Sequence, residues 1–397
     1  WRPASRAGRW RAPPPGPCGR RRETCATRPA NEPSDCALSE RRRMRLLTSL
    51  LLRSSAPGSG AGSGGGQGQQ QLALPKVKCA HCGAIAVPDY RVKVRNLSSS
   101  LQRAYVPLYA DAETLEYVNR SQRRLMSWHS WWYHWFLYHL VTLLRSRFSL
   151  TDANALLSRG EMFVLSTAHA EEMLAGGVGR AADGGHGVGG VLLDIGAGDG
   201  QVTQKLAPLF DAVVATEASA HMERRLRRRN FDVTLATTDL PEVVEVARSA
   251  LAGHSKVNFD GEFDCIALLN VLDRCDKPLT LLKEVKSMLR PGGKLLLAVV
   301  LPFRPFVEDG TRRIPPTEKL GLPRNAGWEL SVQMIVDKVF TPLELQVDRV
   351  ARVPYYSTGN HMHPLYTLDD AVFVLSPMSS SSDVDEHSVL HGEFPAG

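Results

Sequence analysis

The chain has 397 residues, of which 43% are hydrophobic, so it is long enough for one large globular domain with appendages or for two small domains. Its net charge is +7, but residues 1–43 contain 11 arginines against 4 acidic residues, so the whole excess lies there and the remainder is neutral. Because the chain after residue 43 has no net charge, we do not expect it to form a basic surface that binds the phosphates of DNA or RNA, and we expect no nucleic-acid partner.

Residues 1–73 are expected to form a disordered leader and a Gly/Ser/Gln-rich linker. The first methionine is Met44, so the Arg/Pro-rich part before it is also open to interpretation as untranslated sequence. The leucine run at 46–52 resembles a short secretory signal, with a mitochondrial presequence or a plain disordered leader as the alternatives. We therefore expect the endoplasmic reticulum as the compartment, with the mitochondrion or the cytosol as the alternatives.

Residues 74–175 are predicted to form a mostly helical N-terminal cap region. Within it, residues 126–144, "MSWHSWWYHWFLYHLVTLL", contain no Asp, Glu, Lys or Arg and reach the length of a membrane span. Because Trp and His prefer interfaces to the hydrocarbon centre, we expect a helix packed on the main domain, with membrane-surface contact or a true span as alternatives. Cys79 and Cys82 form a lone C-x-x-C without a second pair, so no metal site is predicted, and a disulfide or two free thiols remain open.

Strands and helices alternate between residues 191 and 377, a pattern that implies a parallel sheet covered by helices. A Gly-rich loop at 176–190 precedes this region, and the motif "LRPGG" (289–293) is expected to end its fourth helix in a tight turn. Two final strand-like runs form a hairpin, so we predict an α/β, class I Rossmann-like fold with a seven-stranded, mostly parallel sheet and an antiparallel last strand. Residues 378–397 are expected to be a disordered tail. The five strands before the hairpin are predicted at Val191–Ile195, Ala212–Thr216, Phe231–Ala236, Cys265–Leu269 and Lys294–Leu301.

The first predicted strand ends in a glycine corner, "LLDIGAGDG". Gly196 and Gly198 allow a ligand to approach the backbone closely, and the next helix begins directly behind them. Asp199 lies within the turn and would repel a pyrophosphate, which disfavours a dinucleotide. S-Adenosylmethionine is free of phosphate and cationic at its amino-acid end, and Asp194 is placed to approach that end.

Two downstream features support the same cofactor. Glu217 ends the next strand, "VVATE", where a carboxylate can accept hydrogen bonds from both ribose hydroxyls. The "LRPGG" turn, followed by "KLLL", is typical of class I methyltransferases. Together with the terminal hairpin, these motifs predict an S-adenosylmethionine-dependent methyltransferase that releases S-adenosylhomocysteine. A nicotinamide or flavin enzyme, and glycines that serve packing alone, are the alternatives.

The residues after the fourth predicted strand, "LLNVLDRCDKPLTLL", are expected to face the transferred methyl group. The Asn/Asp-Pro-Pro-aromatic turn of enzymes that methylate base amines is absent from this place, which again disfavours nucleic acid. Asn270 is suited to brace the cofactor or to orient the acceptor, and Asp273 is suited to accept a proton or a hydrogen bond from it. The alternative for Asp273 is an N-cap of the helix that begins near Pro278.

The motifs "LLDIGAGDGQVT", "LNVLDRCDKPLTLLKEV", "VLPFRPFVE" and "LDDAVFVL" closely resemble the DREV methyltransferase family, and the resemblance covers residues 148–377. It implies protein-histidine methylation: transfer to the pros nitrogen, the ring nitrogen nearer the backbone, of His in His-x-His motifs of target proteins, with a small residue at x. It further implies that Glu217, Asn270 and Tyr355 bind the cofactor. Asp273 and Tyr366 would then meet the substrate imidazole, although the surrounding "GNHMHPLYTLDD" departs from the more acidic and aromatic family pattern.

The chemistry of imidazole fits these residues. A neutral imidazole, with a pKa of about 6.5, needs no strong base, and an acceptor such as Asp273 at one ring nitrogen leaves the other nitrogen free to attack. Phe303 and Phe306 are candidates to line a peptide groove, with ordinary core packing as the alternative. The chain also contains its own His361-Met-His363, in which Met is larger than the preferred x. A small-molecule imidazole or amine methyltransferase and a non-catalytic cofactor-binding scaffold are the other interpretations.

Overall fold

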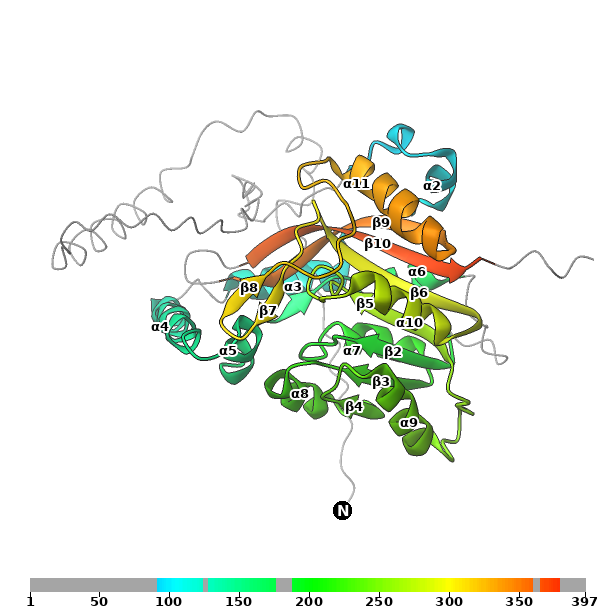
Figure 1. Ribbon diagram of the computed structural model, residues 1–397. Coiled ribbons are helices and arrows are strands. Elements are labelled where there is room, and N and C mark those ends of the chain that lie inside the picture. Colours follow the sequence, from blue (N-terminus) through cyan, green and yellow to red (C-terminus); the bar gives the residue numbers. More distant parts are fainter. Residues whose placement is uncertain (1–90, 124–127, 176–187, 360–364, 379–397) are drawn as a thin grey trace, which may run out of the picture. The chain divides into compact units, whose positions relative to one another are not determined.

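A computed structural model describes residues 91–123, 128–175, 188–359 and 365–378 (Figure 1). These residues belong to one compact unit that begins at Asp89. The predictions for the leader, the linker, Cys79 and Cys82, the 176–187 part of the Gly-rich loop, the His361-Met-His363 motif and the tail after Met378 lie outside the described residues.

The architecture is a mixed α/β fold around one sheet, whose strands follow the order β1-β9-β10-β6-β5-β2-β3-β4 (Figure 1). Strands β4, β3, β2, β5 and β6 run parallel, whereas β10 is antiparallel to both β6 and β9. The predicted seven strands with an antiparallel last strand are confirmed. The eighth strand, β1, pairs with β9 and was not expected. The strands are β1 Met162–Phe163, β2 Val191–Ile195, β3 Ala212–Thr216, β4 Val233–Leu235, β5 Phe263–Leu269, β6 Leu289–Leu301, β9 Leu345–Thr358 and β10 Leu365–Pro377, and a separate hairpin holds β7 Val307–Asp309 and β8 Arg312–Ile314.

Helices cover both faces of the sheet. On one face α2, α9, α10 and α11 bury apolar residues, and on the other face α6 and α7 do so. Neighbouring residues of the central strands, such as Leu192 and Leu193, alternate between these two cores, and both are fully buried. This explains the continuous apolar runs from which the strands were predicted. The helices are α2 Ser99–Ala104, α3 Ala112–Arg123, α4 Trp128–Leu144, α5 Leu150–Leu156, α6 Thr167–Leu174, α7 Thr203–Leu206, α8 Ala220–Leu226, α9 Leu240–Leu251, α10 Pro278–Ser287 and α11 Trp328–Ile335.

The "LRPGG" motif ends α10 as predicted, since the helix stops at Ser287. The glycines do not form a separate turn before the strand, however. Phe263 of β5 pairs with Leu289 and Cys265 pairs with Lys294, so residues 290–293 form a bulge within β6. The strand therefore begins earlier than the predicted Lys294.

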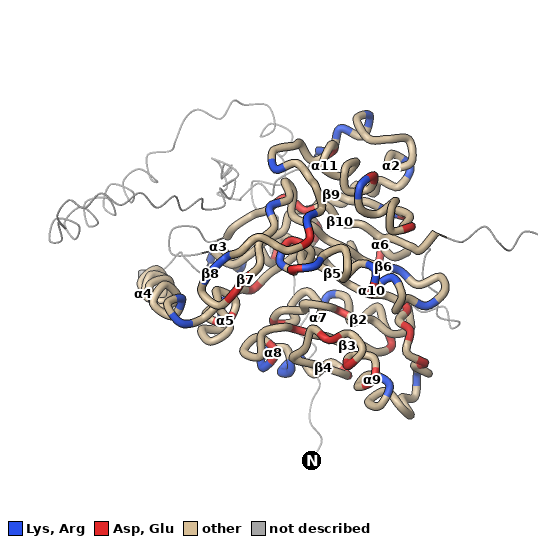
Figure 2. Tube along the Cα trace, in the orientation of Figure 1, with Lys and Arg blue, Asp and Glu red and all other residues tan. Residues whose placement is uncertain are grey.

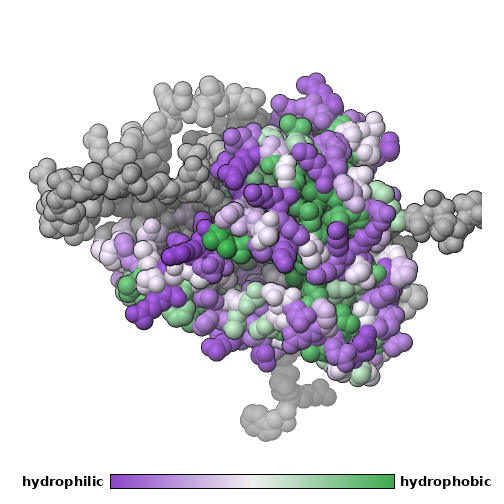
Figure 3. Space-filling view, viewed as in Figure 1, coloured by the Kyte–Doolittle hydropathy of each residue, from purple (hydrophilic) through white to green (hydrophobic). Residues whose placement is uncertain are grey.

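Helix α4 confirms the prediction of a helix in the aromatic stretch, but it packs against the rest of the unit along one side only. Leu137 and Val141 are buried, whereas Tyr133, Phe136 and Leu143 are exposed. Among the residues that the structure describes, no helix combines the length and apolar character needed to cross a membrane. On the face shown in Figure 3, hydrophobic residues form patches among mostly hydrophilic residues.

Candidate active site

The glycine corner lies where β2 ends, against the loop that follows β5. Gly196 and Gly198 have φ angles of 74° and 60°, in the left-handed region that favours glycine. A Cβ at Gly196 would lie 2.8 Å from Cγ2 of Val271, so a side chain there would have to displace the Val271 side chain. Both glycines thus have a local structural reason, and the close approach of a ligand to them stays a prediction.

Glu217 follows β3 and reaches across to the corner. Its carboxylate accepts hydrogen bonds from the backbone N–H groups of Gly198, at 2.9 Å, and of Ser219, at 3.0 Å. Burial raises the pKa of this carboxyl group, and the backbone donors oppose that shift. The two bonds fix the carboxylate beside the corner, where the ribose hydroxyls of an adenosine ligand would be bound.

Glu217→Gln is expected to weaken binding of S-adenosylmethionine by about 10-fold to 100-fold, because an amide replaces a charged acceptor of two ribose hydroxyls. Calorimetric titration with the cofactor measures the effect. Glu242→Gln, which changes an exposed carboxylate of α9, is the matched control and is expected to bind normally. Equal affinity of the Glu217 variant and the control would remove Glu217 from the cofactor site.

The two aspartates of the corner are engaged within the protein. Asp194 accepts a hydrogen bond from Oγ1 of Thr203 at 2.6 Å, which ties β2 to α7, and burial raises its pKa to about 7. Asp199 is 2% exposed and forms ion pairs with Arg225, at 2.8 Å, and Arg229, at 3.4 Å. These arginines balance the Asp199 charge, so that charge is no longer a reason to prefer a cationic ligand over a pyrophosphate. Contacts of Asp194 and Asp199 with the cofactor stay predictions.

Asn270 and Asp370 form a buried polar pair at the end of β5. Asn270 adopts a left-handed conformation, with φ of 61°, and its Nδ2 donates to Oδ2 of Asp370 at 2.8 Å. Asp370 is 0% exposed, and its burial raises the pKa well above the usual range of a carboxyl group. Asp370 is not among the residues predicted from the sequence. The signal for it is the acidic pair in "LDDAVFVL", because one of two successive residues in a strand must face each side of the sheet.

Asp273 lies near this pair and does not cap α10. The N-cap residue of α10 is Lys277, which makes no side-chain capping bond, so the capping alternative for Asp273 is wrong. Asp273 is 2% exposed and forms an ion pair with Arg274 through Oδ2. Burial raises the pKa of Asp273, and the Arg274 guanidinium opposes the shift. The same guanidinium lies 4.1 Å from the centre of the Phe306 ring, which holds it in place.

Three buried oxygens of this cluster have no partner within the described part of the chain: Oδ1 of Asn270, Oδ1 of Asp273 and Oδ1 of Asp370. We refer to these three side chains as the acceptor cluster. Buried polar atoms without partners are costly, so such a group in a methyltransferase fold indicates a ligand site. Oδ1 of Asn270 is an acceptor, and the two carboxyl oxygens are acceptors when Asp273 and Asp370 are ionised, so in that state the site suits a ligand that supplies hydrogen-bond donors.

The other three predicted site residues, Tyr355, Tyr366 and Phe303, differ in burial and in their contacts. Tyr355 of β9 donates from its hydroxyl to Sδ of Met162 at 2.6 Å, and burial together with the nearby Asp370 raises its pKa. Tyr366 of β10 is half-buried. Burial raises the pKa of its hydroxyl group, and the positive charge of Arg159 opposes that shift. Phe303 is 4% exposed and packs in the main core, so its expected position in a peptide groove is wrong, because the apolar ring is enclosed by other core residues.

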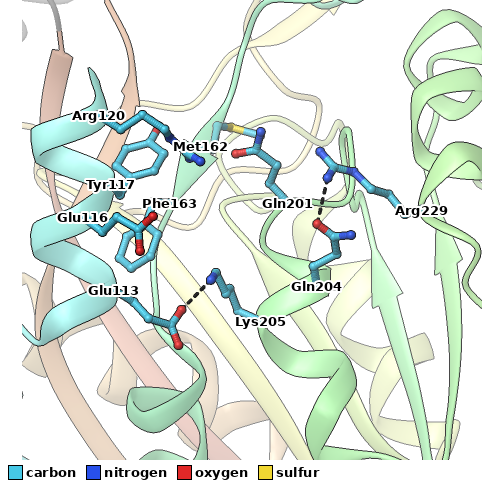
Figure 4. Close-up of a pocket in the computed structure, with 10 residues that line it drawn as sticks. All are labelled: Glu113, Glu116, Tyr117, Arg120, Met162, Phe163, Gln201, Gln204, Lys205 and Arg229. Carbon is cyan, nitrogen blue, oxygen red and sulfur yellow. Dashed lines mark hydrogen bonds and ion pairs between the residues drawn. The ribbon is translucent and has the colours of Figure 1, made fainter. Parts of the chain in front are cut away.

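A polar pocket of about 190 Å³ adjoins the corner (Figure 4). It lies between α3 and β1 on one side and the beginning of α7 on the other, and Glu113 and Lys205 form an ion pair across it at 2.5 Å. Met162 lines this pocket and also accepts a hydrogen bond from the Tyr355 hydroxyl, so it lies between the pocket and Tyr355. The lining residues are Glu113, Glu116, Tyr117, Arg120, Met162, Phe163, Gln201, Gln204, Lys205 and Arg229.

The strand order, the reversed β10, the glycine corner and the carboxylate after β3 define a class I S-adenosylmethionine-dependent methyltransferase. The DREV methyltransferase family model matches residues 90–377, and the chain belongs to this family. S-Adenosylmethionine is therefore its cofactor. Gly196, Gly198, Glu217 and the unpartnered Asn270 amide oxygen fit this ligand, since they offer a close backbone approach and acceptors for its hydroxyl and ammonium groups.

Other known proteins are more distantly similar. The ubiquinone biosynthesis O-methyltransferase of Xanthomonas axonopodis pv. citri is 24% identical over 112 residues, which are 28% of this chain and 44% of that enzyme, so the match spans less than half of its length. The solved structure of DhpI with SAH has 17% identity and a TM-score of 0.33, and it covers 62% of this chain and 98% of its own. An S-adenosylmethionine-dependent methyltransferase from Clostridium acetobutylicum has 16% identity and a TM-score of 0.28, with 48% and 84% covered. The family match alone carries the assignment.

Proposed function

We propose that the protein transfers a methyl group from S-adenosylmethionine to the pros nitrogen of histidine in His-x-His motifs of target proteins, where x is small. The acceptor cluster carries this proposal. A neutral imidazole presents one N–H donor and one nitrogen lone pair, and its N–H suits the free Asp273 oxygen, which is an acceptor when that carboxyl group is ionised. The motifs shared with the DREV family support histidine, rather than another residue, as the methylated side chain.

Asp273 is the residue that orients the target ring. Its free oxygen, Oδ1, accepts the N–H of the far ring nitrogen, and this tautomer leaves the lone pair of the near nitrogen available for attack. Arg274 binds the other carboxylate oxygen, and this ion pair fixes the direction in which the free oxygen can accept a hydrogen bond. Asp273 thus determines which of the two ring nitrogens is the nucleophile.

The negative charge of Asp273 has a second role, after the methyl group has been transferred. The cofactor supplies an electrophilic methyl group, and the methylated ring carries a positive charge with its N–H still on the far nitrogen. Ionised Asp273 stabilises that cation and takes the proton, which restores a neutral ring. Burial raises the pKa of Asp273, which brings it toward the range in which this transfer is efficient.

Incubation of the protein with labelled cofactor and a His-Ala-His peptide tests the proposal. We expect label on a histidine, and mapping of the product should place it on the pros nitrogen. A free imidazole dipeptide such as carnosine is the comparison substrate and is expected to react far more slowly. Label on the far nitrogen, or faster reaction of the free imidazole, would contradict the proposal and favour a small-molecule methyltransferase.

A further inference from the structure

We propose that the exposed face of α4 binds an anionic membrane surface and holds the enzyme there. Tyr133, Phe136 and Leu143 form this face, with exposed fractions of 58%, 57% and 68%. Their spacing of three and seven residues places them along one side of the helix. Leu137 and Val141 are buried on a neighbouring strip of the helix, so the helix already has its packing partner and the exposed face is additional.

The composition of this segment matches the interfacial region of a bilayer. Helix α4 contains four tryptophans, two tyrosines and three histidines, and no acidic residue occurs between positions 128 and 149. Trp and Tyr rings place an apolar body in the acyl boundary and a polar edge among the headgroups. Because α4 does not qualify as a span, it would lie in the plane of the surface.

Basic residues continue the face at the end of α4. Arg145 and Arg147 are exposed and follow the helix directly. Figure 2 shows basic residues along the chain between α4 and α5. Burial lowers the pKa of Arg313 in β8 and the positive charge of Arg145 lowers it further, so the two guanidinium groups are near each other. Arg313 lies 4.2 Å from the centre of the Phe306 ring, which Arg274 also contacts, so basic residues extend from α4 to the neighbour of Asp273. An aromatic stripe bordered by arginines is complementary to anionic headgroups rather than to a second copy of the same basic face.

Hydrogen bonds connect α4 with the active site through α5. Thr151 of α5 donates to Glu308 of β7 at 3.1 Å, and Ser219, two residues after Glu217, donates to Asp152 at 2.5 Å. These bonds join the segment after α4 to β7 and to the loop that carries Glu217. The proposal goes beyond histidine methylation and does not depend on it.

The test uses the full-length protein and vesicles of phosphatidylcholine with and without phosphatidylserine. Brominated lipids quench the fluorescence of inserted Trp, and four of the seven tryptophans lie in α4. The variant Tyr133→Ser/Phe136→Ser/Leu143→Ser keeps every Trp and the basic N-terminal segment, so any change reports on the α4 face. We expect binding to phosphatidylserine vesicles, with a loss of about 10-fold or more in affinity and of most quenching in this variant.

Leu330→Ser is the matched control, because Leu330 is 57% exposed on α11, far along the chain from α4. We expect it to bind vesicles like the original protein. Arg145→Ser/Arg147→Ser keeps the apolar face and should lose the preference for phosphatidylserine. Unchanged binding and quenching in both α4 variants, or an equal loss in the control, would overturn the proposal. Methylation of a free His-Ala-His peptide is expected to persist in both α4 variants, which separates this test from that of the reaction.

Discussion

Asp273→Asn is expected to lower the rate of methyl transfer by about 10²-fold to 10³-fold, within the range for removal of a positioned acid–base group. The amide has the size of the carboxylate but no charge, so it can neither stabilise the methylated ring nor take its proton. Its NH₂ group would also face the far ring nitrogen as a donor if the amide oxygen turned to Arg274. Cofactor affinity, measured by calorimetry, is expected to stay within about twofold of the original, because Glu217 and the glycine corner are untouched.

Asp276→Asn provides the matched control in the same loop. Asp276 accepts hydrogen bonds from Thr317 at the surface and is not part of the acceptor cluster, so transfer by this variant should be nearly normal. The pH profile adds a second readout: because burial raises the pKa of Asp273, the rate should rise with pH as this group ionises. A single-turnover rate of Asp273→Asn equal to that of the control would exclude the proposed role.

The strand–helix part of the fold is predictable because both faces of the sheet are covered. Continuous apolar runs, interrupted by helices of regular spacing, gave β2 and β3 with their observed ends. Strand β1 was missed because two residues are too short to carry a pattern, and its pairing with β9 depends on the tertiary fold. The start of β6 was misplaced because Pro and Gly indicate a turn locally, whereas pairing with β5 continues across the bulge.

The cofactor half of the site was predictable and the acceptor half was predictable only in part. The glycine corner and Glu217 belong to contiguous motifs, so their chemistry can be read from the sequence. Asp370 lies 100 residues from Asn270 along the chain, and no spacing rule joins them. Likewise, the arginines that balance Asp199 come from α8 and the turn after it, so local reasoning assigned its charge to a ligand instead.

Asp370→Asn is expected to lower methyl transfer about 10-fold to 100-fold and at the same time to stabilise the protein. Above the raised pKa, Asp370 is ionised and its free Oδ1 is an acceptor. There the amide oxygen of the variant can still accept from Asn270, but its NH₂ group replaces that acceptor in the cluster. A donor among acceptors disfavours a ligand N–H, which accounts for the loss of rate. Asp370 also positions the Asn270 amide, through the hydrogen bond that its other oxygen accepts.

The stability effect has a definite sign and pH range. Burial raises the pKa of Asp370 well above its unfolded value, so the folded protein favours the protonated carboxyl. The stability this provides is present at low pH and is lost as pH rises through the raised pKa. Asparagine never ionises, so its advantage should appear above that pH, at about 1 kcal/mol or more.

Thermal unfolding between pH 4 and pH 8 should therefore show the Asp370→Asn protein and the original diverging as pH rises. Asp369→Asn is the control on the opposite side of the strand: it weakens a pair of hydrogen bonds with Arg352, at 2.9 and 2.7 Å, and should lower stability while transfer continues. The two neighbouring substitutions thus have opposite expected effects on stability, and only Asp370→Asn is expected to slow methyl transfer. If Asp370→Asn were as active as the original, the acceptor cluster would reduce to Asn270 and Asp273; if it were less stable at pH 8, Asp370 would be ionised and paired in the folded protein.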